Sequence, residues 1–112
     1  MPTFAAALPL LPGKTDDWKR MVEEIAGPRR ADFEDFHRRV GLTKENWYLQ
    51  PTPQGDLVIV YLEGEIPQCF QRFATSDHPF DRWFRQRLLE TEGIDFSQPM
   101  PGPLPQVMLE SR

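Results

Sequence analysis

The chain has 112 residues and a formal net charge of −4, which suits one compact domain spanning residues 1–112, without separate cofactor and substrate domains. Its arginines are scattered among acidic residues, so it has no basic stripe of the kind that binds nucleic acid. The apolar start of the chain lacks a preceding basic segment and meets Pro9 far short of a membrane-spanning length. We therefore expect a soluble cytoplasmic protein with neither a nucleic-acid nor a membrane partner.

The cysteine and histidine content limits the possible chemistry. Cys69 is the only cysteine, which excludes an internal disulfide framework, and His37 and His78 give no zinc-type ligand spacing. A metal held by carboxylates stays open, but no zinc-type metal site is predicted. Nothing in the sequence indicates flavin, haem or nicotinamide, so we predict no cofactor. Cys69 itself is expected to be a small core residue.

The first half of the chain predicts one strand and a helix in two parts. Residues 3–10 can form an extended strand with apolar residues on one face. From Thr15 the apolar residues recur at helical spacing, and Pro28 must interrupt this helix because proline lacks an amide donor. A second helical stripe then runs to Gly41, which is a C-terminal stop signal.

The second half predicts a β-hairpin, two helices and a last strand. Residues 46–50 and 57–63 favour strands, and the proline-rich and glycine-containing stretch between them is typical of a turn. The remaining expected elements are, in order, a short helix around Cys69, a longer helix from Pro79 to Gly93, a proline-rich connector at 98–103 and a final strand at 104–110.

The predicted order is strand, helix, strand, strand, helix, strand, which is the split βαβ arrangement of ferredoxin-like α+β domains with an antiparallel sheet. This layout, together with the stretch Ser76-Asp77-His78-Pro79-Phe80-Asp81-Arg82, resembles small uncharacterised bacterial proteins of the dimeric α/β-barrel superfamily. The resemblance implies that the sheets of two subunits pack face to face and form a barrel-like core.

The strand at 57–62 gives an independent reason to expect a partner. It is apolar at every position, whereas a strand with one face in water should alternate between apolar and polar residues. Burying an apolar side chain of this size is worth roughly 1.5–3 kcal/mol, so leaving three in water would be costly. We therefore predict a homodimer. The alternative is a monomer whose proline-rich C-terminal segment folds across the sheet.

The helix that begins near Pro79 carries the first candidate site. His78, Arg82 and Arg85 follow one another at helical spacing on one face. His78 could act as an acid or base, while the two arginines could bind an anionic or enolate-like oxygen of a small ligand. The alternative is that His78 caps the helix and that the arginines are solvated or paired with nearby acids.

Aromatic residues on the central strands form the second part of this candidate site. Trp47, Tyr48 and Tyr61 could line a cavity between the sheet and the helices, with the Tyr61 hydroxyl as a catalytic proton donor. His37, at the apolar edge of its helix, is a further candidate for binding substrate. All four could equally be packing residues.

Two functional hypotheses follow. The first is a cofactor-free enzyme or binder that acts on a carbonyl or carboxylate compound, with one pocket in each subunit. The second is a non-catalytic regulatory or protein-interaction module. The resembled superfamily includes cofactor-free monooxygenases, cyclases, decarboxylases and ligand-binding regulators, and a shared fold does not choose among them. A cavity with convergent polar groups would favour the first hypothesis, and a solid core would favour the second.

Overall fold

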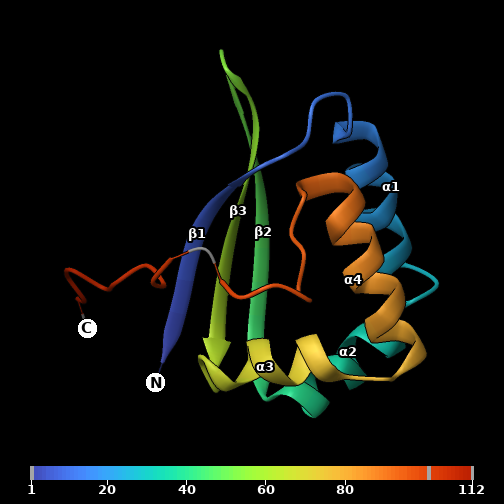
Figure 1. Cartoon of the computed structure of the whole chain (residues 1–112), viewed down its shortest axis with the longest axis vertical. Helices are drawn as coiled ribbons and strands as arrows, with labels where there is room; N and C mark the ends of the chain where they lie inside the picture. Colours follow the sequence, from blue (N-terminus) through green and yellow to red (C-terminus); the bar gives the residue numbers. More distant parts are fainter. Residues whose placement is uncertain (1, 101, 112) are drawn as a thin grey trace.

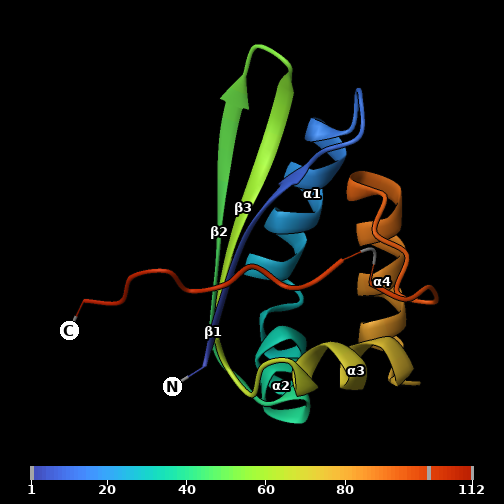
Figure 2. The same cartoon turned by 60° about the vertical axis from the view of Figure 1, so that its left-hand side comes forward.

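A computed structural model describes residues 2–100 and 102–111 of the chain. Its elements in chain order are β1 (Thr3–Pro9), α1 (Thr15–Ala26), α2 (Arg30–Val40), β2 (Leu42–Thr52), β3 (Gly55–Gly64), α3 (Gln68–Thr75) and α4 (Pro79–Glu92). The strands form an antiparallel sheet in the order β1-β3-β2. Figures 1 and 2 show the helices on one face of this sheet, which confirms an α+β fold. No helix in the described part of the chain is long and apolar enough to cross a membrane.

The first two helices confirm the predicted two-part helix. The backbone N–H of Gly27 donates to the carbonyl of Glu23 and closes α1. Residues 27–29 separate α1 from α2, and Gly41 caps the end of α2 with a left-handed φ of 87°. Such a φ favours glycine because a Cβ would be strained there. The α1 stripe buries Trp18, Met21 and Ile25 in the core, where the Trp18 ring lies near that of Trp47 on β2.

The predicted hairpin is also present. Strand β2 pairs with β3 from Leu42 opposite Gly64 to Thr52 opposite Gly55. It begins four residues earlier than the sequence indicated, because the ladder continues past the polar residues that open the strand. Strand β1 pairs with the other edge of β3.

The predicted final strand is wrong. Residues 104–110 pair with no strand among the described residues, so the element order is β-α-α-β-β-α-α rather than the complete ferredoxin-like order. Two causes are visible. Pro103 and Pro105 have no amide donor for a ladder, and the segment crosses the outer edge of β1 instead of running along it (Figures 1 and 2).

The C-terminal segment divides into a part that lines the cavity and a part that is exposed. Residues 94–100 and 102–105 lie against the space between sheet and helices, and we call them the roof. Residues 106–111 are exposed, and we call them the arm. In Figures 1 and 2 the arm extends away from the body of the molecule beyond β1. The arm does not fold across the open face of the sheet, although the monomer alternative requires that it does.

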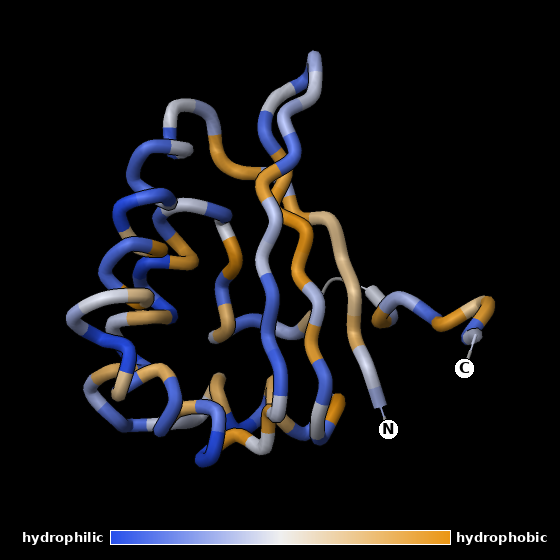
Figure 3. The backbone as a smooth tube through the Cα atoms, turned by 180° about the vertical axis from the view of Figure 1, so that it is seen from behind, coloured by the Kyte–Doolittle hydropathy of each residue, from blue (hydrophilic) through white to orange (hydrophobic). Residues whose placement is uncertain are grey.

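The sheet has one covered and one open face. Val58, Val60 and Leu62 of β3 point toward the helices and belong to or pack on the core. Because side chains alternate along a strand, Leu57, Ile59 and Tyr61 lie on the other face. The chain's own helices therefore cover only half of the apolar strand, as its sequence indicated. Figure 3 shows the hydrophobic colour along β3 and again in the arm.

Candidate functional site

A cavity of about 530 Å³ lies between the covered face of the sheet, the helices and the roof. Its volume falls within the usual range for small-molecule sites. The walls are mostly apolar, and aromatic residues from α2, β2, α3 and α4 contribute to them, among them Phe36, Trp47, Phe73 and Phe84. The polar side chains in this lining include Glu45, Glu92 and Cys69. The cavity is thus a largely apolar space with a few ionisable groups.

Glu45 is held by a hydrogen-bonded cluster. Its Oε1 lies 2.9 Å from Nε2 of His37, and its Oε2 accepts a hydrogen bond of 2.7 Å from the Trp47 indole. A second hollow of about 420 Å³ between α1, α2 and β2 is lined by all three residues. Glu45 and Trp47 also line the large cavity, so this cluster forms a wall between the two spaces. Both carboxylate oxygens of Glu45 are fixed in position.

Glu92, the last residue of α4, is the buried carboxyl group among the acidic residues of the lining, whereas Asp95 is exposed. Loss of hydration raises the pKa of Glu92 to about 7. The Trp18 indole opposes this rise in the pKa, and the charge of Glu45 adds to it. Trp18 Nε1 is buried without a hydrogen bond of normal geometry, so Glu92 is only weakly stabilised as an anion. Burial therefore favours the protonated form of Glu92 far more than that of an exposed glutamate.

Cys69 brings a thiol from α3 to the cavity lining. Burial, followed by the nearby charge of Glu45, raises the pKa of this thiol to about 11. The thiolate is the reactive form of cysteine. Cys69 is therefore a packing residue, as predicted, and its position makes it a useful chemical probe of the cavity.

The structure brings only some of the sequence-predicted site residues to this cavity. Trp47 lines the cavity. His37 does not line it but is hydrogen-bonded to Glu45, which does. Tyr48 and Tyr61 lie on the open face, where the Tyr61 hydroxyl donates to Glu63 at 2.6 Å and Tyr48 is 54% exposed. That hydrogen bond, with partial burial, raises the pKa of Tyr61. The expectation that the tyrosines line a cavity on the helix side is therefore wrong, because they alternate with residues that do.

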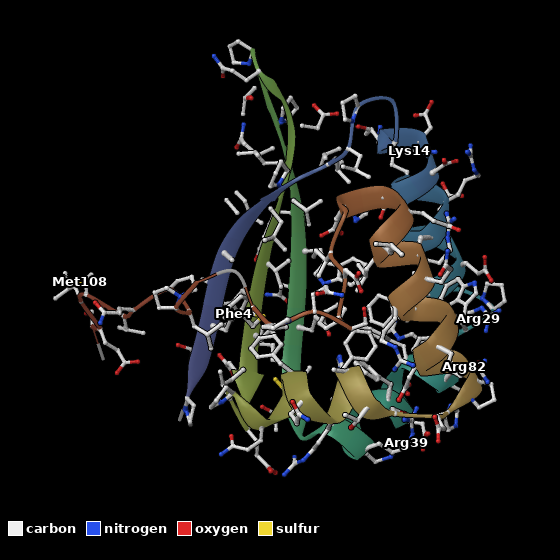
Figure 4. The ribbon with its side chains drawn as sticks, in the orientation of Figure 1. Phe4, Lys14, Arg29, Arg39, Arg82 and Met108 are labelled. Atoms are coloured by element: carbon white, nitrogen blue, oxygen red, sulfur yellow. The ribbon has the colours of Figure 1, made fainter. Side chains whose placement is uncertain are left out.

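His78, Arg82 and Arg85 do not line either hollow formed by the described residues. Nδ1 of His78 accepts a hydrogen bond from the Phe80 amide and caps α4. Arg85 donates to the carbonyls of Phe73 and Ser76 and so satisfies the end of α3. Arg82 is exposed and lies on the outer side of α4 (Figure 4). The expectation that these three residues form an anion site is therefore wrong. Their contacts agree with the alternative in which His78 caps the helix.

The stretch from Ser76 to Arg82 has a structural explanation. Pro79 opens α4, and Asp81 in its first turn is fully buried. Asp81 accepts hydrogen bonds from Ser76 Oγ and from both terminal nitrogens of Arg39 on α2. This carboxylate raises the pKa of Arg39. The motif therefore joins α4 to α2 and does not form a binding site.

Sequence reasoning missed the two carboxyl groups. Glu45 is two residues before Trp47 on the same strand, so any cavity that contains the Trp47 side chain also faces Glu45. Glu92 is four residues after Leu88 and continues the apolar stripe of α4. An acidic residue at an inward position of a strand or helix was the available signal.

Comparison with protein-family models, curated proteins and solved structures finds no match to this chain. Within residues 2–100 and 102–111, no group of three or more histidine, cysteine, aspartate or glutamate side chains is arranged to hold a metal ion.

Proposed function

We propose that this protein binds an apolar carbonyl compound in the cavity and moves a proton on it without a cofactor. The observation that carries this proposal is the pair of carboxyl groups, Glu45 and Glu92, in one aromatic-lined cavity. Carboxyl groups in different environments can supply a base and an acid at the same pH. Glu45 is held by two hydrogen-bond partners, whereas burial favours the protonated form of Glu92.

The lining favours a neutral carbonyl compound over a carboxylate. A ligand anion would meet the charge of Glu45 in a largely apolar space, where like charges repel more strongly than in water. Arg85 donates its hydrogen bonds to carbonyls at the end of α3, and Arg82 is exposed outside the cavity, so neither is available to such an anion. The aromatic walls suit a flat ring system that carries a ketone or aldehyde group.

The chemistry supported by this arrangement is enolisation. Glu45 would take a proton from the carbon next to the carbonyl, which breaks a C–H bond and forms an O–H bond on the carboxylate. The electron pair moves onto the carbonyl oxygen, where Glu92 supplies its proton. The product is the enol, and return of a proton to another carbon would give an isomer. No oxidant or further reactant is needed.

The test uses 2-acetylnaphthalene and smaller aromatic methyl ketones, with 2-naphthoate as the anionic counterpart. We expect a ketone to raise the melting temperature by several degrees, because a ligand of the folded state stabilises it. The same ketone should slow alkylation of Cys69 by N-ethylmaleimide. In D2O, the protein should exchange the methyl hydrogens of the ketone, as followed by NMR.

Variants separate binding from catalysis. Glu45→Gln should still bind the ketone but lose at least 100-fold in exchange rate, within the usual contribution of a general base. Glu90→Gln, an exposed carboxyl on α4, is the matched control and should exchange like wild type. Binding without exchange in wild type would indicate a ligand-binding regulator. Stronger binding of 2-naphthoate than of every ketone would contradict the proposal.

We further propose that the protein is a homodimer whose open sheet faces pack together. Leu57, Ile59 and Tyr61 form a central stripe on that face, with Ala5 and Ala7 beside them on β1. Small residues next to a stripe of larger ones leave room for a second sheet, and paired sheets lie about 10 Å apart. This arrangement is the one that the dimeric α/β-barrel resemblance implies.

Light scattering after size exclusion tests the dimer. We expect a mass of twice 13.1 kDa at micromolar concentration. Ile59→Asp places a charge at the centre of the open face and should give a monomer, because an unpaired buried charge is strongly unfavourable. Gln71→Asp, at an exposed position of α3 on the helix side of the sheet, is the control. A wild-type monomer whose mass does not change on concentration would contradict the dimer.

A further inference from the structure

The arm exposes three consecutive apolar residues. Val107, Met108 and Leu109 are 59%, 85% and 89% exposed, and Met108 lies far from the body of the molecule in Figure 4. Single apolar residues on a surface are ordinary, but a continuous run of this kind marks an interaction surface. The arm therefore needs a partner that the chain itself does not supply.

The route of the arm indicates on which side that partner lies. Leu104 and Pro105, just before the arm, line the cavity together with Phe4 of β1. The arm therefore starts on the helix side of the sheet, next to β1. Near its far end, Glu110 is close enough to Tyr61 for its charge to contribute to the raised pKa of that residue. Tyr61 is on the open face. The arm thus passes from the helix side of the sheet to the open side.

The length of the arm suits a second copy across that face. Six extended residues reach about 20 Å. Two packed sheets are separated by about 10 Å. The apolar run in the middle of the arm can therefore cross the gap and contact the second subunit.

We propose that the arm of each copy packs its apolar run, residues 107–109, on the other copy across the paired open faces. This inference rests on the proposed homodimer and deepens it. Because the arm continues directly from the roof, its attachment to the partner also holds the roof against the cavity. Access to the cavity is therefore linked to dimerisation, and an undocked arm leaves the roof attached at one end only.

The test compares two double variants that add the same charge to the arm. Val107→Asp with Leu109→Asp places two carboxylates in the apolar run, on the same side of an extended chain. Gln106→Asp with Ser111→Asp adds two carboxylates at polar positions outside the run. All four residues are exposed, so both variants should keep the fold of each subunit, as circular dichroism would show.

We expect the dimer dissociation constant of the apolar-run variant, from sedimentation equilibrium, to rise at least 100-fold while the control stays within a few-fold of wild type. Alkylation of Cys69 by N-ethylmaleimide should be faster in the apolar-run variant, and in wild type diluted below its dissociation constant. Equal dissociation constants for the two variants would overturn the arm contact and leave the sheet-face dimer intact. A weakened dimer with an unchanged alkylation rate would overturn the link to the cavity. A monomeric wild type would overturn both proposals.

Discussion

Replacing Asp81 by alanine is expected to lower the free energy of unfolding by about 3 kcal/mol. Asp81 is fully buried and accepts hydrogen bonds from Ser76 and Arg39. Removing one partner of a buried ion pair typically costs 3–5 kcal/mol, because it leaves the other charge uncompensated. We place this variant at the lower end, because the Arg39 side chain is 29% exposed and still pairs with Asp35.

Urea unfolding followed by fluorescence measures this loss. Asp35→Ala provides a matched control because it removes the other carboxylate of the same arginine, one that is 45% exposed. Exposed pairs contribute little, so Asp35→Ala should lower the unfolding free energy clearly less than Asp81→Ala. Equal losses in the two variants would show that burial of Asp81 is not what makes its contact with Arg39 important.

Replacing Glu92 by glutamine should stabilise the protein by about 2–3 kcal/mol at pH 8 and hardly at all at pH 4. The pKa of Glu92 is raised from 4.5 to about 7 by burial, so the folded state holds this proton more tightly than the unfolded chain. The stability that comes from the protonated carboxyl is complete below the unfolded pKa and is lost as pH rises through about 7. A rise of the pKa from 4.5 to about 7 corresponds to roughly 3 kcal/mol. Glutamine keeps a similar shape and carries no charge at any pH.

The measurement is the difference in unfolding free energy between variant and wild type at several pH values from 4 to 8. Glu90→Gln is the control on the same helix. It is exposed, and its hydrogen bonds with Gln86 and Arg87 lower its pKa, so it should show no gain at pH 8. A gain for Glu92→Gln that is the same at pH 4 and pH 8 would mean that its charge is not the source of the effect.

Local patterns were sufficient for most of the fold. The helical stripe from Thr15, the break before α2 and the hairpin of β2 and β3 all follow from periodicity and turn residues, and the structure has them. The final strand failed because a strand exists only with a partner strand, and the composition of residues 104–110 cannot show whether one is available. The apolar second face of β3 was predictable because it depends on alternation within one strand.

The candidate site was less predictable. His78, Arg82 and Arg85 do share a helical spacing, but spacing does not show whether a helix face meets a cavity or the end of another helix. The contacts of Arg85 with the carbonyls at the end of α3 depend on a tertiary arrangement. Glu45 and Glu92 belong to elements that were predicted correctly, yet acidic residues are so often solvated that their inward positions gave only a weak signal.

The buried position of Cys69 has a consequence for handling and for the interpretation of gels. A thiol that is enclosed and rarely ionised at neutral pH reacts slowly with oxygen or with another thiol. Two folded chains cannot bring these sulfurs together, because each is buried on the inner side of α3 within its own subunit. A disulfide-linked pair on a non-reducing gel would therefore record past unfolding of the sample. A native dimer would run as a monomer on the same gel, because no disulfide joins its two chains.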